Sequence, residues 1–211
     1  MELLTAIFSI AVALTLGAMS PGPSFVMVAR TSLAVSRRDG LAAAVGMGIG
    51  GVVFSAIALL GLLAILTAVP LLYIALKVLG GAYLLYLGYQ IYRGAQHPLV
   101  LENTPLKSHV TQPWRSFVLG LTTQLSNPKT AVVYASVFTS LLPRETPSFI
   151  VVILPVMIFA IETIWYSVVA FALSASSPRA RYLASKAWLD RTAGAIMTFL
   201  GLKLISETLQ P

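Results

Sequence analysis

The feature that most constrains this chain is a proline-rich interruption inside a long apolar stretch near its N-terminus. The stretch is long enough to cross a bilayer, yet it contains Ser20-Pro21-Gly22-Pro23-Ser24. Each proline removes a backbone donor and clashes with the preceding turn, and the glycine adds freedom, so a helix must break here. Broken backbone at membrane depth is tolerated only where it is packed in protein or lines a wet cavity.

A second interruption, Ser126-Asn127-Pro128-Lys129, lies in another apolar stretch about half a chain later. We interpret the two interruptions as the floor of one substrate site. The alternative is that both are kinks, capped by Ser24, Ser126 or Asn127. Two breaks at matching positions, one of them doubled, favour a binding role.

The composition predicts an all-α integral membrane protein with a single domain, residues 1–211. Hydrophobic residues make up 57% of the chain and charged residues only 10%, and the mean hydropathy is +0.87. A soluble domain is nearer half apolar and a quarter charged. The net charge of +7 does not indicate nucleic-acid binding, because the basic residues gather at the ends of apolar stretches. There is no cysteine, which excludes disulfides and thiolate metal sites.

Hydropathy predicts six transmembrane spans, and the first and fourth contain the interruptions. The spans are 3–30, 41–67, 71–93, 115–142, 147–175 and 190–208. We expect the first to be a retained helix rather than a signal peptide, because it lacks a basic start and its only early charge is Glu2.

The basic residues predict the topology. Ten lie in or beside the first, third and fifth connections: Arg30, Arg37, Arg38, Arg93, Lys107, Arg115, Arg179, Arg181, Lys186 and Arg191. Only Lys77, Arg144 and Lys203 lie on the other side. This bias places the first set in the cytoplasm and both termini outside it.

The two halves of the chain resemble each other. The segment from Gly81 to Gly88 is similar to the segment from Gly194 to Gly201, and Ser20 aligns with Ser126. We therefore predict two three-helix repeats, 1–94 and 114–211, joined by a cytoplasmic loop, 95–113. Three crossings force the second repeat to insert upside down, which brings the broken helices together near the midplane. Chance similarity between apolar segments is the alternative.

The helix that resumes after Pro23 should present unpaired N–H groups around Ser24 to Met27. Such a helix end can hold a carboxylate without a charged side chain. The same reasoning applies after Pro128, where Lys129 adds a formal charge.

Glu162 lies near the centre of the fifth span and should be paired or protonated there. Lys129 is its natural partner. Either the two form a structural ion pair, or Glu162 and Lys129 couple protons and Glu162 meets a substrate ammonium. Further side chains that can line the same cavity are Gln124, Thr122, Thr123, Trp165 and Tyr166. For these five, ordinary helix packing explains the sequence equally well.

Taken together, these motifs resemble the lysine-exporter/homoserine–threonine-resistance (LysE/RhtB) family over essentially the whole chain. The residues that carry the resemblance are Ser20-Pro21-Gly22-Pro23, the glycine-rich start of the second span, the Gly81–Gly88 segment and Asn127-Pro128-Lys129. The resemblance implies export of amino acids from the bacterial cytoplasm across the inner membrane, driven by protons, often by a homodimer, with no cofactor. It also implies that Pro21, Gly22, Pro23, Asn127, Pro128 and Lys129 belong to the functional core.

Members that export lysine or arginine tend to carry an acidic residue early in the second helix, where this chain has Gly48-Ile49-Gly50-Gly51-Val52. We therefore expect a neutral zwitterion, such as a threonine-, homoserine- or leucine-like amino acid. Export of a metal or another ion is the alternative, but it calls for clustered ligands within the spans. An intramembrane enzyme would need a nucleophile paired with a base at depth, which the sequence does not supply.

Overall fold

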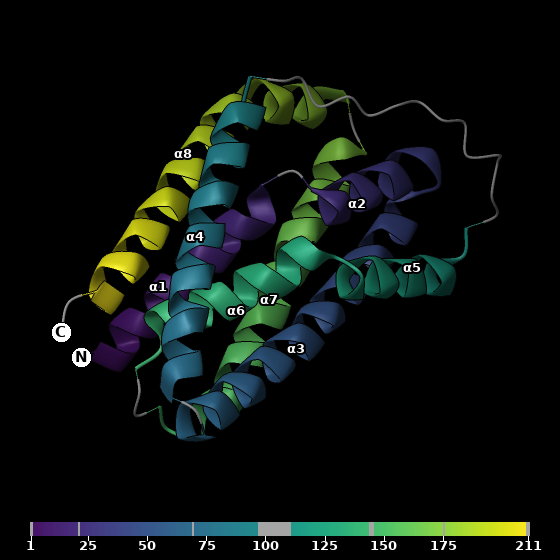
Figure 1. Ribbon diagram of the computed structural model, residues 1–211. Coiled ribbons are helices and arrows are strands. Elements are labelled where there is room, and N and C mark those ends of the chain that lie inside the picture. The colour runs from purple at the N-terminus through teal and green to yellow at the C-terminus, as the bar shows by residue number, and fades with distance from the viewer. Residues whose placement is uncertain are drawn as a thin grey trace.

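The computed structural model describes residues 2–20, 22–68, 70–96, 111–143, 146–174 and 176–209, and all regular structure there is helical. The helices are α1 (Glu2–Met19), α2 (Pro23–Ala34), α3 (Arg37–Ala68), α4 (Pro70–Gly94), α5 (Pro113–Leu125), α6 (Pro128–Leu141), α7 (Ile150–Leu173) and α8 (Ser176–Leu209). They pack into one bundle in which α4 and α8 run side by side (Figure 1). The prediction of an all-α chain is confirmed.

Both predicted interruptions separate two helices. The axes of α1 and α2 differ by 57°, and Pro23 is the first residue of α2. Ser126 and Asn127 separate α5 from α6, which begins at Pro128. Proline suits the first helical position because its missing N–H would have no partner there. Pro21 lies outside the described residues, as do residues 97–110 of the predicted loop.

The largest difference from the predicted spans is at the C-terminal helix. Residues 176–189, which we expected in a connection, form the first part of α8. This stretch is rich in polar and basic residues, so hydropathy does not identify it as part of a span. Nothing in its composition prevents a helix, however. The predicted sixth span, 190–208, is the later part of the same helix.

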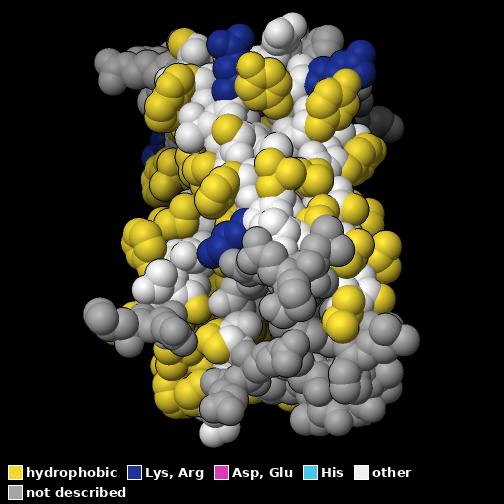
Figure 2. Space-filling model, turned by 60° about the vertical axis from the view of Figure 1, so that its left-hand side comes forward, with side chains coloured by type: hydrophobic (Ala, Val, Ile, Leu, Met, Phe, Trp, Pro, Cys, Tyr) yellow, Lys and Arg dark blue, Asp and Glu magenta, His cyan; other side chains and the backbone are white. Residues whose placement is uncertain are grey.

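The outer surface of the bundle is apolar. Large hydrophobic side chains are exposed along α1, α3, α4, α7 and α8, including Phe8, Ile57, Leu79, Val156 and Phe199. Figure 2 shows such side chains spread over the described surface of one face from top to bottom, with Lys and Arg at its upper end and near its middle. A surface of this kind is stable against lipid rather than water.

Within the described residues, two helical segments are long and apolar enough to cross a membrane, Arg37–Leu62 of α3 and Ile150–Leu173 of α7. The bent pair α1 and α2 makes a third if it counts as one span. The chain is therefore a membrane protein. The full set of six spans in two inverted repeats remains a prediction.

Glycines allow the closest helix contacts. On α4 and α8 they pair crosswise: a Cβ on Gly81 would lie 3.1 Å from the carbonyl oxygen of Gly201, and a Cβ on Gly88 would lie 2.7 Å from that of Gly194. On α3 and α5, a Cβ on Gly46 would collide with the carbonyl oxygen of Phe117. Small residues let helix backbones approach where lipid offers no hydrophobic driving force.

Candidate substrate site

A small cavity lies between the two interruptions. Its volume is about 20 Å³, which is room for about one water molecule. It is lined by residues from α1, α2, α6, α7 and the interruptions themselves: Leu14, Gly17, Ala18, Ser20, Gly22, Ser24, Asn127, Lys129, Thr130, Val133, Tyr134, Glu162 and Tyr166. Most of the predicted site residues that the structure describes are therefore brought together here.

Hydrogen bonds join the two interruptions directly. The Ser24 hydroxyl donates to Gln124 Oε1 over 2.7 Å and accepts from Asn127 Nδ2 over 2.9 Å. All three side chains are buried. Buried polar groups must be paired to be tolerated, so this chain of bonds fixes the start of α2 against the end of α5 and the start of α6.

Lys129 points from α6 toward the first interruption. Its Nζ donates to the carbonyl oxygens of Gly17 and Ser20 over 3.3 and 3.2 Å. These carbonyls belong to the C-terminal end of α1, where a cation is favoured by the helix dipole. A Cβ placed on Gly22 would lie 3.6 Å from the same Nζ. The ammonium therefore lies beside the start of α2.

Glu162 is buried on α7 and accepts a hydrogen bond from the Tyr134 hydroxyl through Oε1 over 2.7 Å. Within the described residues, no salt bridge joins Glu162 to Lys129. The alternative in which these two side chains form an ion pair is therefore wrong for this conformation. They interact only at longer range, across the cavity.

Beside the cavity, one side-chain donor and one side-chain acceptor do not form hydrogen bonds. Gln124 Nε2 and Glu162 Oε2 are both buried without a hydrogen-bond partner. The two groups are near enough to interact electrostatically, but they do not form a well-directed hydrogen bond. Glycines of α3 allow this approach, since a Cβ on Gly50 would lie 2.7 Å from Gln124 Cβ and one on Gly51 would lie 3.2 Å from Glu162 Cγ.

The remaining predicted site residues lie elsewhere. Pro23 and Pro128 begin their helices and do not line the described cavity. Trp165 packs against the apolar cluster formed by α2, α3 and α7. Thr122 and Thr123 do not line the cavity either, and the exposed Thr122 bonds to the Val118 carbonyl of its own helix.

The predicted set of unpaired N–H groups is too wide. The N–H of Val26 donates to the carbonyl oxygen of Gly22 over 3.0 Å, so helical hydrogen bonding already begins there. The open end of α2 is therefore confined to the residues before Val26. Its N-cap residue, Gly22, provides no side-chain cap.

Sequence reasoning missed two groups of polar residues. Tyr134 bonds to Glu162, but a tyrosine in an apolar helix is indistinguishable from a packing residue. Lys186 and Asp190 form a buried salt bridge of 2.6 Å on α8, whereas the sequence placed Lys186 in or beside a cytoplasmic connection. The spacing of four residues between opposite charges was the available signal.

The apolar outer surface, the spanning helices and the charged side chains between interrupted helices are typical of an integral membrane transport protein. This class is supported by comparison with known proteins. The model of the LysE type translocator family matches residues 15–208. The chain belongs to this family, and the resemblance seen in its motifs is confirmed. It is a transporter rather than an enzyme.

The chain is also similar to curated bacterial proteins along nearly its whole length. It is 33% identical over 202 residues to a "Threonine efflux protein" of Salmonella typhimurium, covering 94% of this chain and 96% of that protein. It is 32% identical over 187 residues to a "Threonine efflux protein" of Escherichia coli K12, covering 89% and 91%. An "Uncharacterized membrane protein" of Haemophilus influenzae is 28% identical over 191 residues, covering 90% of each chain. No solved structure matches the chain significantly.

Proposed function

We propose that this chain is a secondary transporter that exports neutral, threonine-, homoserine- or leucine-like amino acids from the cytoplasm. The observation that carries the proposal is the cavity between the interruptions, which is lined by one half-buried cation, Lys129, and one buried carboxylate, Glu162, that form no salt bridge with each other. A zwitterion carries the complementary pair of charges. A neutral solute or a simple ion does not.

The substrate carboxylate docks at the uncapped start of α2, where Gly22 leaves the helix end open. Lys129 lies within reach of the same point and adds a formal charge. A helix N-terminus and an ammonium group together favour a carboxylate without any further charged side chain. Asn127 holds the start of α6 so that Lys129 points inward.

The substrate ammonium docks at Glu162, whose Oε2 makes no well-directed hydrogen bond within the described residues. Among the described residues that line the cavity, Glu162 is the one carboxylate. A second acid would be needed to balance a cationic side chain, so the site favours neutral amino acids. Threonine is the natural first candidate, because two similar proteins are named threonine efflux proteins.

Transport requires the site to open, because the cavity of about 20 Å³ is far smaller than an amino acid. The other face of α6 borders a much larger apolar cavity of about 430 Å³, lined by residues of α3, α4 and α6 such as Ile57, Leu79 and Val132. We propose that the α6 half-helix moves toward this space, where its Ser136 packs against Gly80 of α4. We propose that the two three-helix repeats, 1–94 and 114–211, rock about the site to give alternating access.

Glu162 also suits proton coupling. A buried carboxylate without an ammonium partner is costly at membrane depth. A proton can neutralise Glu162 on the return of the empty carrier, whereas the substrate ammonium does so during export. Substrate and proton then cross the membrane in opposite directions. The positive charge of Lys129 disfavours simultaneous binding of the proton and the substrate ammonium at Glu162.

Export of labelled threonine from proteoliposomes tests these roles. We expect the wild-type protein to move threonine against its gradient when a proton gradient is imposed. Glu162→Gln should abolish the response to the proton gradient, and Lys129→Ala should weaken threonine binding. Lys203→Ala, an exposed lysine on α8, is the matched control. Unchanged, gradient-driven transport by both site variants would remove the assigned roles.

The topology of this proposal places the chain in the bacterial inner membrane with both termini outside the cytoplasm. The absence of cysteine allows a direct test, since single cysteines can be introduced without background. A cysteine near either terminus should react with an impermeant thiol reagent from the outer side. Labelling of one near Gln112 from that side would reverse the orientation. The homodimer implied by the family is a separate proposal, to be tested by cross-linking in the membrane.

A further inference from the structure

The larger cavity, between α3, α4 and α6, is continuous with the outer surface of the bundle. Its volume of about 430 Å³ lies in the range of pockets that bind small molecules. Two of its lining residues, Ile57 of α3 and Leu79 of α4, are 62% and 66% exposed and belong to the apolar outer surface. That surface is the one that faces lipid. The cavity therefore opens toward the interior of the bilayer.

The lining of this cavity favours hydrocarbon over water. Among the described residues it contains no charged side chain, and the Thr139 hydroxyl donates to the carbonyl oxygen of Ala135 in its own helix over 2.6 Å. A water molecule needs about two to four polar partners to be stable in a cavity. An unfilled space, in turn, deprives the lining atoms of their dispersion contacts. An apolar molecule from the membrane satisfies both conditions.

The cavity also reaches well below the surface. Ser136 and Thr139 of α6 line it although they are only 2% and 4% exposed. Ser136 lies at the crossing with α4, where a Cβ on Gly80 would be 3.1 Å from its hydroxyl oxygen. The space is therefore deep enough to hold a molecule between the helices, and not only against their outer faces.

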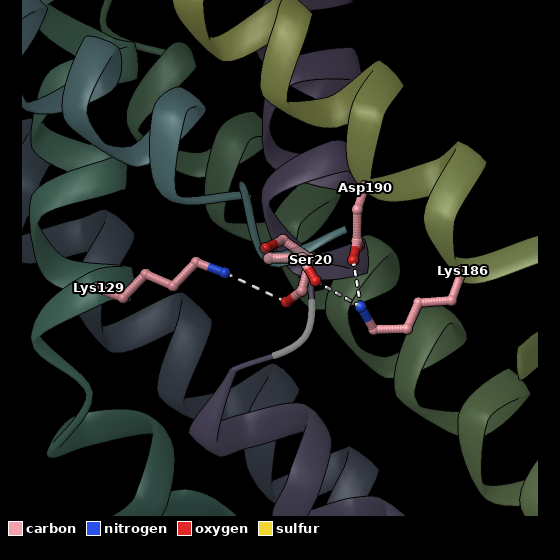
Figure 3. Close-up of polar contacts among 5 residues, drawn as sticks. Ser20, Lys129, Lys186 and Asp190 are labelled. Atoms are coloured by element: carbon pink, nitrogen blue, oxygen red, sulfur yellow. Dashed lines mark hydrogen bonds and ion pairs between the residues drawn. The ribbon is translucent and has the colours of Figure 1, made fainter. Parts of the chain in front are cut away.

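The α6 helix separates this cavity from the substrate site. Lys129 and Tyr134 line the cavity at the substrate site, and Lys129 extends from α6 to the carbonyl oxygen of Ser20 (Figure 3). Val132 and Ser136 line the larger cavity instead, and none of the described residues lines both. A molecule in the larger cavity therefore packs against the helix that presents Lys129.

We propose that the larger cavity binds one acyl chain of a membrane lipid, which enters past Ile57 and Leu79 and packs against α6. The bilayer supplies such chains at high concentration, and an acyl chain carries no polar group that would lose hydration in the cavity. While the chain is bound, it opposes the movement of α6 away from the substrate site, so transport requires the chain to withdraw. The effect on transport rests on the proposed function, whereas the lipid site does not.

Photo-cross-linking in proteoliposomes tests the occupant. The lipid is phosphatidylcholine with a diazirine near the end of one acyl chain, and mass spectrometry identifies the modified residues. We expect cross-links at Ser136 and Thr139, which are too deeply buried to meet lipid on the outer surface. Val133 and Val137 are buried on the same helix but do not line this cavity, and they should remain unmodified. Equal modification of all four residues, or none at Ser136 and Thr139, would overturn the proposal.

Gly61 allows the protein itself to fill the cavity. It lines the cavity, and a Cβ placed on it meets no atom within 4 Å, so Gly61→Phe adds a ring to open space. We expect this variant to lose the lipid cross-links at Ser136 and Thr139. A Cβ on Gly94 also meets no atom within 4 Å, but Gly94 lines neither cavity, so Gly94→Phe should keep the cross-links. Cross-links that persist in Gly61→Phe would place the acyl chain elsewhere and overturn the site.

Threonine exchange measures the consequence for transport. We expect Gly61→Phe to lower the maximal rate about tenfold and to leave the half-saturating concentration within about twofold, as for a typical coupling between separate sites. Gly61→Leu, with a smaller side chain, should have a smaller effect of the same kind, and Gly94→Phe should match wild type. A normal rate in Gly61→Phe after loss of the cross-links would overturn the effect on α6. If wild type moves no threonine but keeps the cross-links, the proposed function has failed and the lipid site stands.

Discussion

The two interruptions look alike in sequence but differ in how their helix ends are satisfied. At the second, the Asn127 side chain accepts a hydrogen bond from the backbone N–H of Lys129 over 3.1 Å, so α6 carries its own cap. At the first, Gly22 precedes Pro23 and no side chain caps α2. The chain turns more openly there, with a bend of 57° between α1 and α2.

This difference in capping implies different roles for the two helix ends at the site. The capped end of α6 is a fixed frame that presents the Lys129 side chain. The uncapped end of α2 leaves a helix terminus to be completed by something from outside the chain, and a carboxylate is what such a terminus favours. Under the proposed function, the two breaks therefore have different roles: the second supports Lys129, and the first receives the substrate carboxylate.

Filling the uncapped N-terminal end of α2 should have the largest effect on transport. Gly22 has φ −145° and ψ −171°, an extended conformation that any residue adopts, and a Cβ there makes only ordinary contacts with Lys129. Gly22→Val should fold but fill the cavity, and threonine transport should fall about 10- to 200-fold. Transport rate and thermal unfolding of the purified protein measure the two effects. Gly94→Val is the control, because a Cβ on Gly94 meets no atom within 4 Å and Gly94 lines neither cavity. Equal transport by both variants would contradict the assignment.

Cutting the link between the two interruptions should mainly affect stability. Ser24→Ala leaves Gln124 Oε1 and Asn127 Nδ2 buried without their partner. Each buried unsatisfied group costs about 1–3 kcal/mol, so the midpoint of thermal unfolding should fall clearly. Thr122→Val removes a hydroxyl that bonds only within its own helix, and it should leave the midpoint nearly unchanged. A reversed order of the two midpoints would mean that the link is not a structural contact.

Removing the cap of the second interruption should have a smaller effect. Asn127→Ala should destabilise the protein by about 1 kcal/mol through the loss of the N-cap. It also removes the bond from Asn127 Nδ2 to Ser24, but the Ser24 hydroxyl keeps its bond to Gln124. Asn127→Ser keeps an oxygen at the cap and should recover part of this loss. Unfolding by heat in detergent reports the change. No change in stability with Asn127→Ala would mean that α6 does not depend on its cap.

Adding a cap to the first interruption gives the smallest but most specific effect. Gly22→Ser should stabilise α2 by about a few tenths of a kcal/mol. The new hydroxyl then occupies the helix end that we assign to the substrate carboxylate. We expect the threonine concentration for half-maximal transport to rise while the protein becomes slightly more stable. Unchanged affinity would place the carboxylate somewhere else.

The sequence was sufficient to predict the elements that depend on short, local residue patterns. Proline inside an apolar run interrupts a helix wherever it lies, so both interruptions were placed to within a residue or two. Burial of Glu162 followed from its position in a long apolar run in the same way. The predicted spans 41–67 and 71–93 differ little from α3 and α4 for the same reason.

The partners of the buried charges could not be predicted, because they depend on how helices far apart in sequence are packed. The sequence favours Lys129 as the partner of Glu162, but Glu162 bonds to Tyr134 and Lys129 bonds to the end of α1. The early start of α8 was missed because a polar helix gives no hydropathy signal. Its salt bridge lies in that same missed stretch.

The crosswise pairing of glycines on α4 and α8 has a consequence for the origin of the chain. The first glycine of each segment meets the second glycine of the other, which is how two identical surfaces meet about a two-fold axis. If the predicted inverted repeat arose by duplication, a single ancestral three-helix chain would already have carried both glycines and could have paired with itself. Duplication and fusion of its gene would then have required no new contact at this crossing.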